Sequence, residues 1–433
     1  MGTEISLDIA GLSVDWSKNR RGVDHGFLFQ EDDRRRVPWK DEDHDDDPNQ
    51  ALMEMAFTRP LDTVLPRLEL LGHTLATARV DYERVAAVCA EDRRSFREEG
   101  IGEELPLELM SFREFKEFVT RDPISDLDDS YSGDMSEDGE RRMRGRFADN
   151  AITDRVPTTE AYDGVAYSER SYFGSLIGFL HPYNALRLLA ENEGNLHADL
   201  EWRYGPLVCA GWAMEGDFVP EVRREQTFLI ATEGTSDTHI IKHAVSLLRP
   251  EIADFFRFVD VSKRYPFTGT GNLVRFAQGL TKIDVHNQLL FVLDNDAEGV
   301  SAHRRISELE LPANMRAAPL PELKRFRNFR TRGPDGTGKA DINGRAAAIE
   351  CYLDLTTGKN PPAQVIWTAY KEDLSVYQGE LESKETYTKT FLKRAPKIKG
   401  YDMSGLTAVL DMIFAECCAI AETGYSSRTT ALR

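Results

Sequence analysis

Two stretches of sequence decide the fold: TFLIATEGTSD at residues 227–237 and LLFVLDNDAEG at residues 289–299. Each begins with a continuous apolar run of a length that suits a buried strand, and a helical pattern follows each run. Apolar runs that alternate with helices are typical of a parallel sheet covered on both faces. The sequence therefore predicts an α/β domain with a parallel sheet flanked by helices over residues 226–360.

Acidic side chains follow both apolar runs. Glu233 comes directly after the first run and Asp237 opens the next helix, and the second run is followed by Asp294, Asp296 and Glu298. In open α/β sheets, ligands bind outside the carboxyl ends of the strands, so these carboxylates converge on one crevice if the two strands are neighbours. Carboxylates at close range raise one another's pKa values, and a divalent cation relieves that repulsion. Oxygen ligands suit Mg²⁺ or Mn²⁺, which clamp phosphate oxygens and generate hydroxide. The pattern predicts metal-dependent hydrolysis of phosphodiesters.

Composition limits the class of protein. The chain has 433 residues, a net charge of −19 and five cysteines without a C-x-x-C pair, which argues against a disulfide framework or a structural zinc site. No apolar run reaches the length of about 18 residues that a membrane span needs, and no secretory signal pattern is present. A soluble, cytoplasmic protein with two or three domains is expected. Proteins that only coat nucleic acid are usually basic, so this acidic chain needs a local basic track to act on nucleic acid.

The first half of the chain reads as a mixed α+β region, residues 1–225. Apolar residues at period two within residues 3–30 predict a small hairpin, and apolar spacings of three and four predict helices over 51–120. Residues 40–50 and 123–147 are predicted to be flexible acidic loops. Residues 361–433 read as a basic and helical extension that packs on the α/β domain.

Two basic clusters follow the acidic ones. The first contains Lys324, Arg325, Arg327, Arg330 and Arg332 with Phe326 and Phe329 between them, and Lys389 and Lys393 belong to the second, at 388–400. Cations with aromatic neighbours are what a nucleic-acid track needs, although solvated loops have the same composition. The glycine-rich stretches 266–276 and 333–339 lack a complete Walker A motif. We interpret 333–339 as a flexible loop and expect no ATPase element.

The order strand–E-G-x-x-D–helix, then strand–D-x-D-x-E, resembles the Toprim domain of topoisomerases, primases and overcoming-lysogenization-defect nucleases. Outside it, ISLDIAGLSVDWSKN at 5–19, RLELLGHTLATARVDYE at 67–83, FLHPYNALRLLAEN at 179–192 and DINGRAAAIECYLDL at 341–355 resemble the bacterial HEPN/Toprim-associated proteins. That resemblance covers most of the chain. It implies a nuclease in antiviral defence that forms a homo-oligomer or works with a partner protein such as an ATPase.

The Toprim resemblance assigns roles to individual residues. Glu233 matches the glutamate that serves as acid/base or metal ligand, Asp294 and Asp296 match the metal-holding pair, and Asp237 and Glu298 complete the shell. Glu350 and Asp354, four residues apart on an expected helix, either hold a second metal or form a solvent-facing acidic pair. The same resemblance implies that a lysine of the second basic cluster, Lys393, stabilises the pentavalent transition state.

Two other functions remain open from the sequence. HEPN ribonucleases act without metal through an Arg and a His at the spacing that Arg67 and His73 show, but the polar residue that usually follows the arginine is missing. If this pair is catalytic, the chain is a metal-independent ribonuclease. The other alternative is a non-catalytic regulatory or structural subunit of a defence complex. Chelation separates these alternatives from the metal-dependent nuclease, because EDTA abolishes the activity of the metal-dependent nuclease and leaves that of the HEPN-type ribonuclease unchanged.

Overall fold

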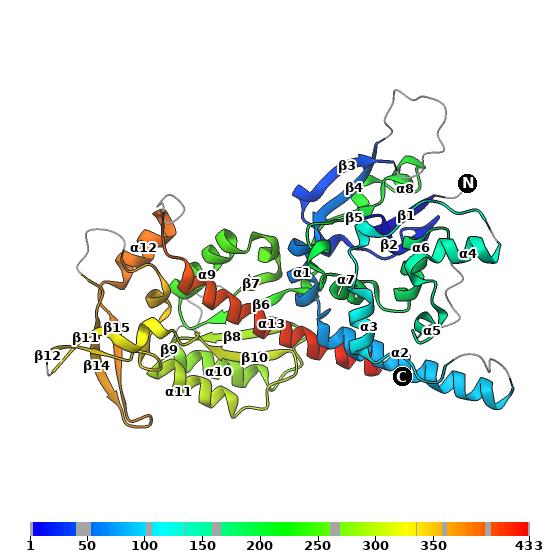
Figure 1. Cartoon of the computed structure of the whole chain (residues 1–433). Coiled ribbons are helices and arrows are strands. Elements are labelled where there is room, and N and C mark those ends of the chain that lie inside the picture. The colour runs from blue at the N-terminus through cyan, green and yellow to red at the C-terminus, as the bar shows by residue number, and fades with distance from the viewer. Residues whose placement is uncertain are drawn as a thin grey trace. The chain divides into compact units, whose positions relative to one another are not determined.

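Contacts between residues divide the chain into two units, Met1–Val222 (unit 1) and Arg223–Arg433 (unit 2). The computed structural model describes residues 3–39, 53–100, 106–134, 136–157, 166–259, 269–334, 336–356, 362–394 and 400–431. Each unit has its own sheet, drawn in Figure 1. The segment 361–433, predicted to be an extension that packs on the α/β domain, belongs to the same unit as that region.

Unit 1 is built on a five-stranded antiparallel sheet in the order β2-β1-β5-β4-β3. The strands are β1 (Glu4–Ile9), β2 (Leu12–Lys18), β3 (Arg34–Pro38), β4 (Met53–Pro60) and β5 (Asp199–Arg203). The period-two pattern forms the β1–β2 hairpin, whose two-residue turn has positive φ at both Ala10 and Gly11. Such a turn matches the twist of the flanking strands. The hairpin is therefore one edge of a larger sheet that the sequence pattern did not reveal.

Helices of unit 1 pack on that sheet and on one another. They are α1 (Leu61–Leu70), α2 (Leu75–Glu98), α3 (Phe112–Val119), α4 (Glu137–Arg144), α5 (Asn150–Thr153), α6 (Glu169–Ile177), α7 (Pro182–Leu189) and α8 (Gly205–Cys209). The prediction of helices over 51–120 is wrong for β4, which is a strand because its apolar residues pair with β5 inside the sheet.

The predicted flexible loop at 123–147 is wrong for its described residues. It contains α4 and two short 3-10 helices, Ile124–Asp126 and Gly145–Phe147. Ile124, Leu127 and Phe147 are buried, so three apolar anchors fix a segment whose overall composition is polar. The acidic stretch 40–50 lies outside the described residues.

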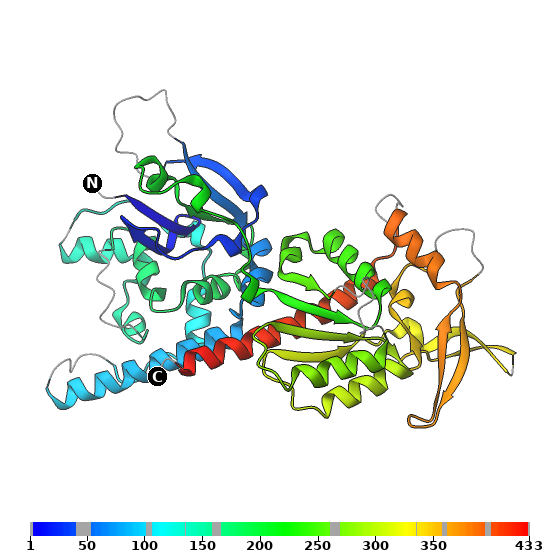
Figure 2. The ribbon, with the colours of Figure 1, turned by 180° about the vertical axis from the view of Figure 1, so that it is seen from behind.

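Unit 2 contains a parallel sheet in the order β10-β8-β6-β7, which is compatible with the predicted α/β domain. Its strands are β6 (Phe228–Thr232), β7 (Phe256–Phe258), β8 (Gln288–Leu293) and β10 (Met315–Pro319). Figures 1 and 2 show α10 (Thr270–Leu280) and α11 (Ala297–Ser307) on one side, with α9 (Thr235–Leu248) and α13 (Ser404–Ala431) on the other. Alternate residues of β8 therefore face two buried layers, which explains the continuous apolar run.

A second sheet of unit 2 has the order β12-β11-β14-β15. Its strands are β11 (Phe329–Gly333), β12 (Gly336–Ala340), β14 (Val365–Lys371) and β15 (Val376–Leu381), followed by α12 (Lys384–Arg394). The short strands β9 (Asn295–Asp296) and β13 (Ala346–Ala347) pair separately. The prediction of a loop at 333–339 is thus wrong, because most of this segment forms a hairpin with β11.

Helix α13 bears on the expectation that no segment crosses a membrane. Among the described residues, it is one helix whose length and composition suffice for a span, with a mean hydropathy of 1.6 over Ser404–Tyr425. Half of that segment is buried, and the helix contacts α9, β8 and β10. Its apolar residues therefore have a partner surface within unit 2.

Candidate active site

The parallel pairing of β6 and β8 brings their acidic ends together. Phe228 to Thr232 pair in register with Gln288 to Val292, so Glu233 and Asp294 leave the sheet at the same edge. The backbone N–H of Asp294 donates to Glu233 Oε1 at 3.0 Å. Two acids 61 residues apart in the sequence are therefore in direct contact.

Glu233 is held from a third segment. The hydroxyl of Thr270, at the start of α10, donates to Glu233 Oε2 at 2.7 Å. The N–H of Gly269 donates to the Glu233 carbonyl at 2.9 Å, and Gly269 has a φ of 94°, which glycine adopts without strain. The sequence showed a glycine-rich turn before this helix, although it gave no indication that Thr270 contacts Glu233.

Asp237 lies in the first turn of α9 and is almost completely buried. Its Oδ2 accepts from the N–H of Gly234 at 2.8 Å, and its Oδ1 accepts from the hydroxyl of Ser236 at 3.1 Å. These bonds close the turn between β6 and α9. The carboxylate therefore has a structural part in the turn as well as a place among the acidic side chains.

Asp294 and Asp296 flank the β8–α11 junction. Asp294 Oδ1 accepts from the N–H of Ile349 at 3.0 Å. Asp296 caps α11 by accepting from the N–H of Gly299 at 2.8 Å, and its other oxygen accepts from the Gln378 amide at 2.7 Å. A Cβ at Gly299 would lie 2.1 Å from the Asp294 carbonyl oxygen, so only glycine fits this turn.

The downstream acidic pair divides into two different roles. Ile349–Tyr352 is a short 3-10 helix that ends before Asp354, so the expected helical face shared with Glu350 does not exist. Glu350 is 5% exposed and its charge acts on both Asp237 and Asp294. Asp354 instead accepts hydrogen bonds from Thr356 and, at 3.1 Å, from the N–H of Asp402, and so ties down the chain before α13.

We define the acidic cluster as Glu233, Asp237, Asp294, Asp296 and Glu350. Burial and mutual repulsion raise the pKa values of the first four. Burial is the largest cause, and it raises the pKa of Glu233 to about 7 and that of Asp237 to about 6. Burial followed by four neighbouring carboxylates raises the pKa of Asp294 well above its ordinary value. The pKa of Asp296 is also raised, chiefly by burial. Without a cation, the cluster therefore retains protons at neutral pH.

The cluster fits a hard divalent cation by its chemistry, because every member offers carboxylate oxygen. The side chains are not arranged as a ligand shell. Among the described residues, no three His, Cys, Asp or Glu side chains are grouped so that they could hold a metal ion. Backbone N–H groups and hydroxyls engage oxygens of Glu233, Asp237, Asp294 and Asp296. Ligation would require some of these side chains to turn toward a shared centre.

Two residues of the β14–β15 hairpin lie at the strand ends without any sequence pattern that marks them: Gln378 contacts the cluster, and Lys371 contacts the neighbouring Glu298. Gln378 donates to Asp296, and its Oε1 accepts from the N–H of Glu298 at 3.2 Å. Lys371 forms an ion pair of 2.7 Å with Glu298, whose side chain is half exposed. Glu298 is therefore paired with a lysine, outside the cluster. No local motif marks Gln378 or Lys371, because their role depends on how the hairpin packs.

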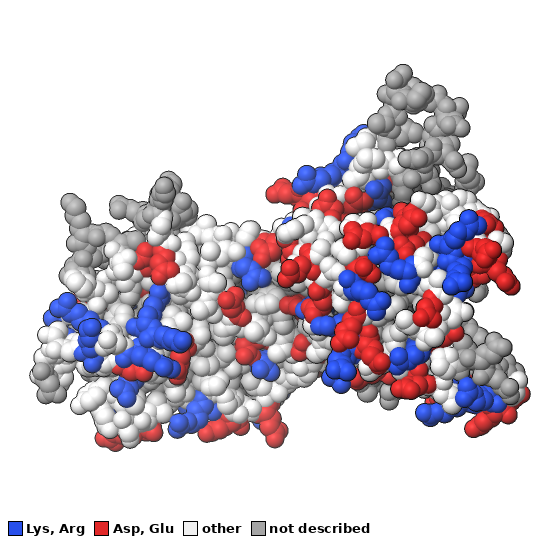
Figure 3. Space-filling model, in the orientation of Figure 1, with Lys and Arg blue, Asp and Glu red and all other residues white. Residues whose placement is uncertain are grey.

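The predicted basic residues lie on three elements of unit 2. Lys324, Arg325 and Arg327 belong to a 3-10 helix, Arg330 and Arg332 to β11, and Lys389 and Lys393 to α12. Some are paired: Arg325 with Asp402, Arg332 with Glu382 and Lys389 with Glu385. Lys393 is exposed, and within the described residues no hydrogen bond or ion pair joins it to the cluster. Figure 3 shows Lys and Arg side chains gathered over the β11–β12–β14 region.

In unit 1, Arg67 and His73 are buried and engaged in packing. Arg67 is completely buried and donates to the carbonyls of Phe27 at 3.0 Å and Phe29 at 3.2 Å. His73 contacts Asn184 at 2.9 Å and stacks on His181, and burial lowers its pKa to about 3. A neutral histidine and an arginine that holds backbone carbonyls do not present an accessible pair to a phosphodiester.

Replacing Arg67 is expected to destabilise unit 1. Arg67→Met leaves two buried carbonyls without this donor, and each such loss costs about 1–3 kcal/mol. Thermal unfolding of the full chain checks this, with the exposed Arg79→Met as control. A variant as stable as the wild type that has lost a ribonuclease activity would instead establish a catalytic Arg67.

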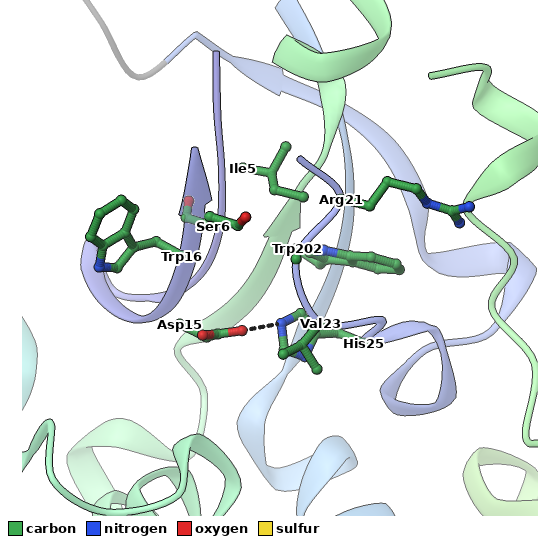
Figure 4. A pocket seen from close by; sticks show the side chains of 10 residues that line it. Ile5, Ser6, Asp15, Trp16, Arg21, Val23, His25 and Trp202 are labelled. Carbon is green, nitrogen blue, oxygen red and sulfur yellow. Dashed lines mark hydrogen bonds and ion pairs between the residues drawn. The ribbon is translucent and has the colours of Figure 1, made fainter. Parts of the chain in front are cut away.

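A small cavity lies beside a second buried histidine of unit 1. Figure 4 shows His25 among its lining side chains, with Nε2 at 2.9 Å from Asp15 Oδ2. The other ring nitrogen, Nδ1, lies 2.7 Å from the Tyr183 hydroxyl. The volume of about 10 Å³ is at the lower limit for one water molecule. This cavity does not admit a nucleotide.

Comparison with known proteins identifies a family for the first half of the chain. The model of the HEPN/Toprim N-terminal domain 1 family matches residues 1–226. No curated protein and no solved structure matches the chain. The matched segment corresponds closely to unit 1, Met1–Val222. Because the match covers more than half of the 433 residues, the chain belongs to the HEPN/Toprim N-terminal domain 1 family.

Proposed function

We propose that the protein is a divalent-metal-dependent nuclease that hydrolyses phosphodiester bonds at the acidic cluster of unit 2. Membership of the family suggests a nuclease-associated role. The observation that carries the proposal is the direct contact of Glu233 with Asp294 at the carboxyl ends of two adjacent parallel strands. This edge is where open α/β sheets bind their ligands.

The five carboxylates suit the binding of Mg²⁺ or Mn²⁺, with Asp294 and Asp296 as the central pair and Glu233, Asp237 and Glu350 around them. When bound, such an ion polarises a phosphate oxygen and lowers the pKa of water. Glu233, with a pKa near 7, is suited to accept a proton at neutral pH. Gln378 orients Asp296 through its amide, and Thr270 orients Glu233.

Metal dependence is the first test. The full chain is incubated with plasmid DNA, linear duplex DNA, single-stranded DNA and total RNA, with Mg²⁺, Mn²⁺ or EDTA. We expect cleavage with one of the metals and none with EDTA. Glu233→Gln should be inactive, while Glu308→Gln, which changes an exposed glutamate at the far end of α11, should keep full activity.

A non-catalytic subunit is the second candidate, and one observation favours it: the described side chains do not form a metal-ligand group. That candidate predicts an inert protein with every substrate and either metal. It also predicts that isothermal titration with Mn²⁺ gives the same result for the wild type and for Asp294→Asn, because neither binds the ion at the cluster. Binding of Mn²⁺ to the wild type and not to the variant contradicts it.

A defence role in the cytoplasm, in a homo-oligomer or with a partner protein such as an ATPase, belongs to the same proposal. Protection of cells from phage infection by the wild-type chain, and its loss in Glu233→Gln, is the expected result.

A further inference from the structure

The β11–β12 hairpin is a two-stranded ribbon that projects from unit 2, as both Figure 1 and Figure 2 show. β11 pairs with β12 from Phe329–Ala340 to Gly333–Gly336. Residues 336–339 of β12 are all exposed. The ribbon therefore offers a surface that the described residues of unit 2 do not cover.

The pairing register of the ribbon places its charged side chains on one face and its glycines on the other. Arg330 is opposite Lys339 and Arg332 is opposite Thr337, so these four residues share one face, called the cationic face below. The other face carries Thr331, Gly333, Gly336 and Gly338. Arg332 also lies 3.5 Å from Glu382, whereas Arg330 and Lys339 form no ion pair within the described part of the chain. Two of the three cations are thus available to an anionic partner.

The cationic face continues toward the acidic cluster. Arg332 is next to Ile366 on β14, and Ile366 is opposite Glu380 on β15. Gln378 lies two residues before Glu380 on β15 and so on the same face, where its amide donates to Asp296. One face of one sheet therefore carries both the ribbon's cations and the residue that contacts the cluster.

Aromatic side chains lie on the opposite face of this sheet. Tyr370 is opposite Tyr377, their rings are 5.1 Å apart, and Trp367 is next to Tyr377 at 6.3 Å. Surfaces that bind single strands combine cations with aromatic rings on which bases stack. The cationic face of the ribbon has no aromatic residue, because Arg330, Arg332, Thr337 and Lys339 occupy its positions. Its chemistry suits phosphates and groove edges.

We propose that the β11–β12 ribbon binds double-stranded DNA by placing its cationic face in the major groove. This inference rests on the proposed function and assigns its substrate class. The major groove of B-form DNA, about 12 Å wide, admits a two-stranded β-ribbon. The corresponding groove of duplex RNA is deep and narrow, so side chains do not reach its floor. In a chain of net charge −19, an uncovered ribbon with three cations on one face complements this polyanion.

Adjacent positions on β12 allow a test of which face binds. Thr337→Glu places a carboxylate on the cationic face, and Gly338→Glu places the same group on the other face. Both positions are exposed, and a Cβ at Gly338 meets no atom within 4 Å, so both variants keep the fold. Both also change the net charge by the same amount. Anisotropy of a labelled duplex, measured with the full chain in EDTA, compares their affinities.

We expect Thr337→Glu to weaken duplex binding about tenfold or more, since like charges face each other, and Gly338→Glu to leave it within about twofold. Equal losses in the two variants, or a larger loss in Gly338→Glu, overturn the proposal. Wild-type protein should bind duplex DNA more tightly than single-stranded DNA or duplex RNA of the same sequence. Tighter binding of either alternative also overturns it.

Salt dependence provides a second measurement. Neutralising Arg330, Arg332 and Lys339 to Gln should reduce the slope of log affinity against log salt by about 1 for each phosphate that the ribbon no longer neutralises. The matched control neutralises Lys282, Arg304 and Arg305, which are exposed on the α10–α11 side. An unchanged slope in the ribbon variant, or an equal change in the control, contradicts the proposal.

Binding in EDTA keeps this test separate from the proposed nuclease function. If the ribbon variants lose duplex binding while the wild type shows no metal-dependent cleavage, only the proposed hydrolysis fails. If cleavage depends on metal and on Glu233 while the ribbon variants bind and cut duplex DNA normally, only the ribbon assignment fails.

Discussion

Asp294→Asn is expected to abolish cleavage and, at the same time, to make the metal-free protein more stable. The side chain lies among Glu233, Asp237, Asp296 and Glu350, and burial together with their charges raises its pKa. An amide keeps the shape and carries no charge, so the variant no longer has to keep a carboxyl protonated inside the buried cluster. If the ion contributes about 4 kcal/mol to the transition state, the loss of its central ligand reduces the rate about 10³-fold.

Thermal unfolding in EDTA measures the gain in stability. A unit of this size shifts its melting temperature by about 2–4 °C for each kcal/mol. Asp284→Asn is the matched control, because the Asp284 side chain is 89% exposed and precedes the amino end of β8, whereas the cluster lies at the carboxyl ends. A variant that cleaves as fast as the wild type would remove Asp294 from the proposed site. A folded variant less stable than the wild type would contradict the raised pKa of Asp294.

The acidic cluster is expected to make metal-free unit 2 less stable as the pH rises from about 4 to about 7. The pKa of Glu233 rises from 4.5 to about 7 on folding and that of Asp237 from 3.8 to about 6. Between these values the folded state binds more protons than the unfolded chain, so the free energy of unfolding falls with increasing pH. For Glu233 alone, the free energy of unfolding that is lost by the time the pH has passed 7 is on the order of 3 kcal/mol.

Added Mn²⁺ should reverse this loss at pH 8 and have little effect at pH 4, where the carboxylates are protonated. A ligand at a hundred times its dissociation constant stabilises a protein by about 2.7 kcal/mol. Urea unfolding at several pH values, with and without Mn²⁺, gives the measurement, and Asp294→Asn serves as the variant that should not respond to Mn²⁺. Stability that increases between pH 4 and pH 7 in EDTA would contradict the raised pKa values.

Much of unit 2 could be predicted because its signals are local. A run such as LLFVL is apolar at every position because each residue of β8 faces a buried layer. Asp237 lies in the first turn of α9 and Asp296 caps α11, where a helix N-terminus needs side-chain acceptors for its free N–H groups. The positions of Glu233 and Asp294 at strand ends were therefore readable, although their contact depended on β6 and β8 being neighbours.

Elsewhere, sequence patterns misled because the deciding contacts were remote. Strand β4 resembled the start of a helical region, since nothing local shows that β5, more than a hundred residues away, pairs with it. Arg67 and His73 match a catalytic spacing, but the carbonyls of Phe27 and Phe29 and the side chain of Asn184 give them packing roles. Asp354 looked like a partner of Glu350 only while that segment was expected to be one helix.

By itself, the sequence determined the strand–acid–helix order of the α/β region, since apolar runs and capping acids leave a residue-by-residue imprint. The tertiary structure alone decided that Glu350 joins the acidic cluster, that Asp354 and Glu298 have other partners, and that Gln378 and Lys371 reach the strand ends. The physical reason is that burial, pKa and hydrogen-bond partners depend on which segments the fold packs together, and strand pairing over long sequence separations has no local code.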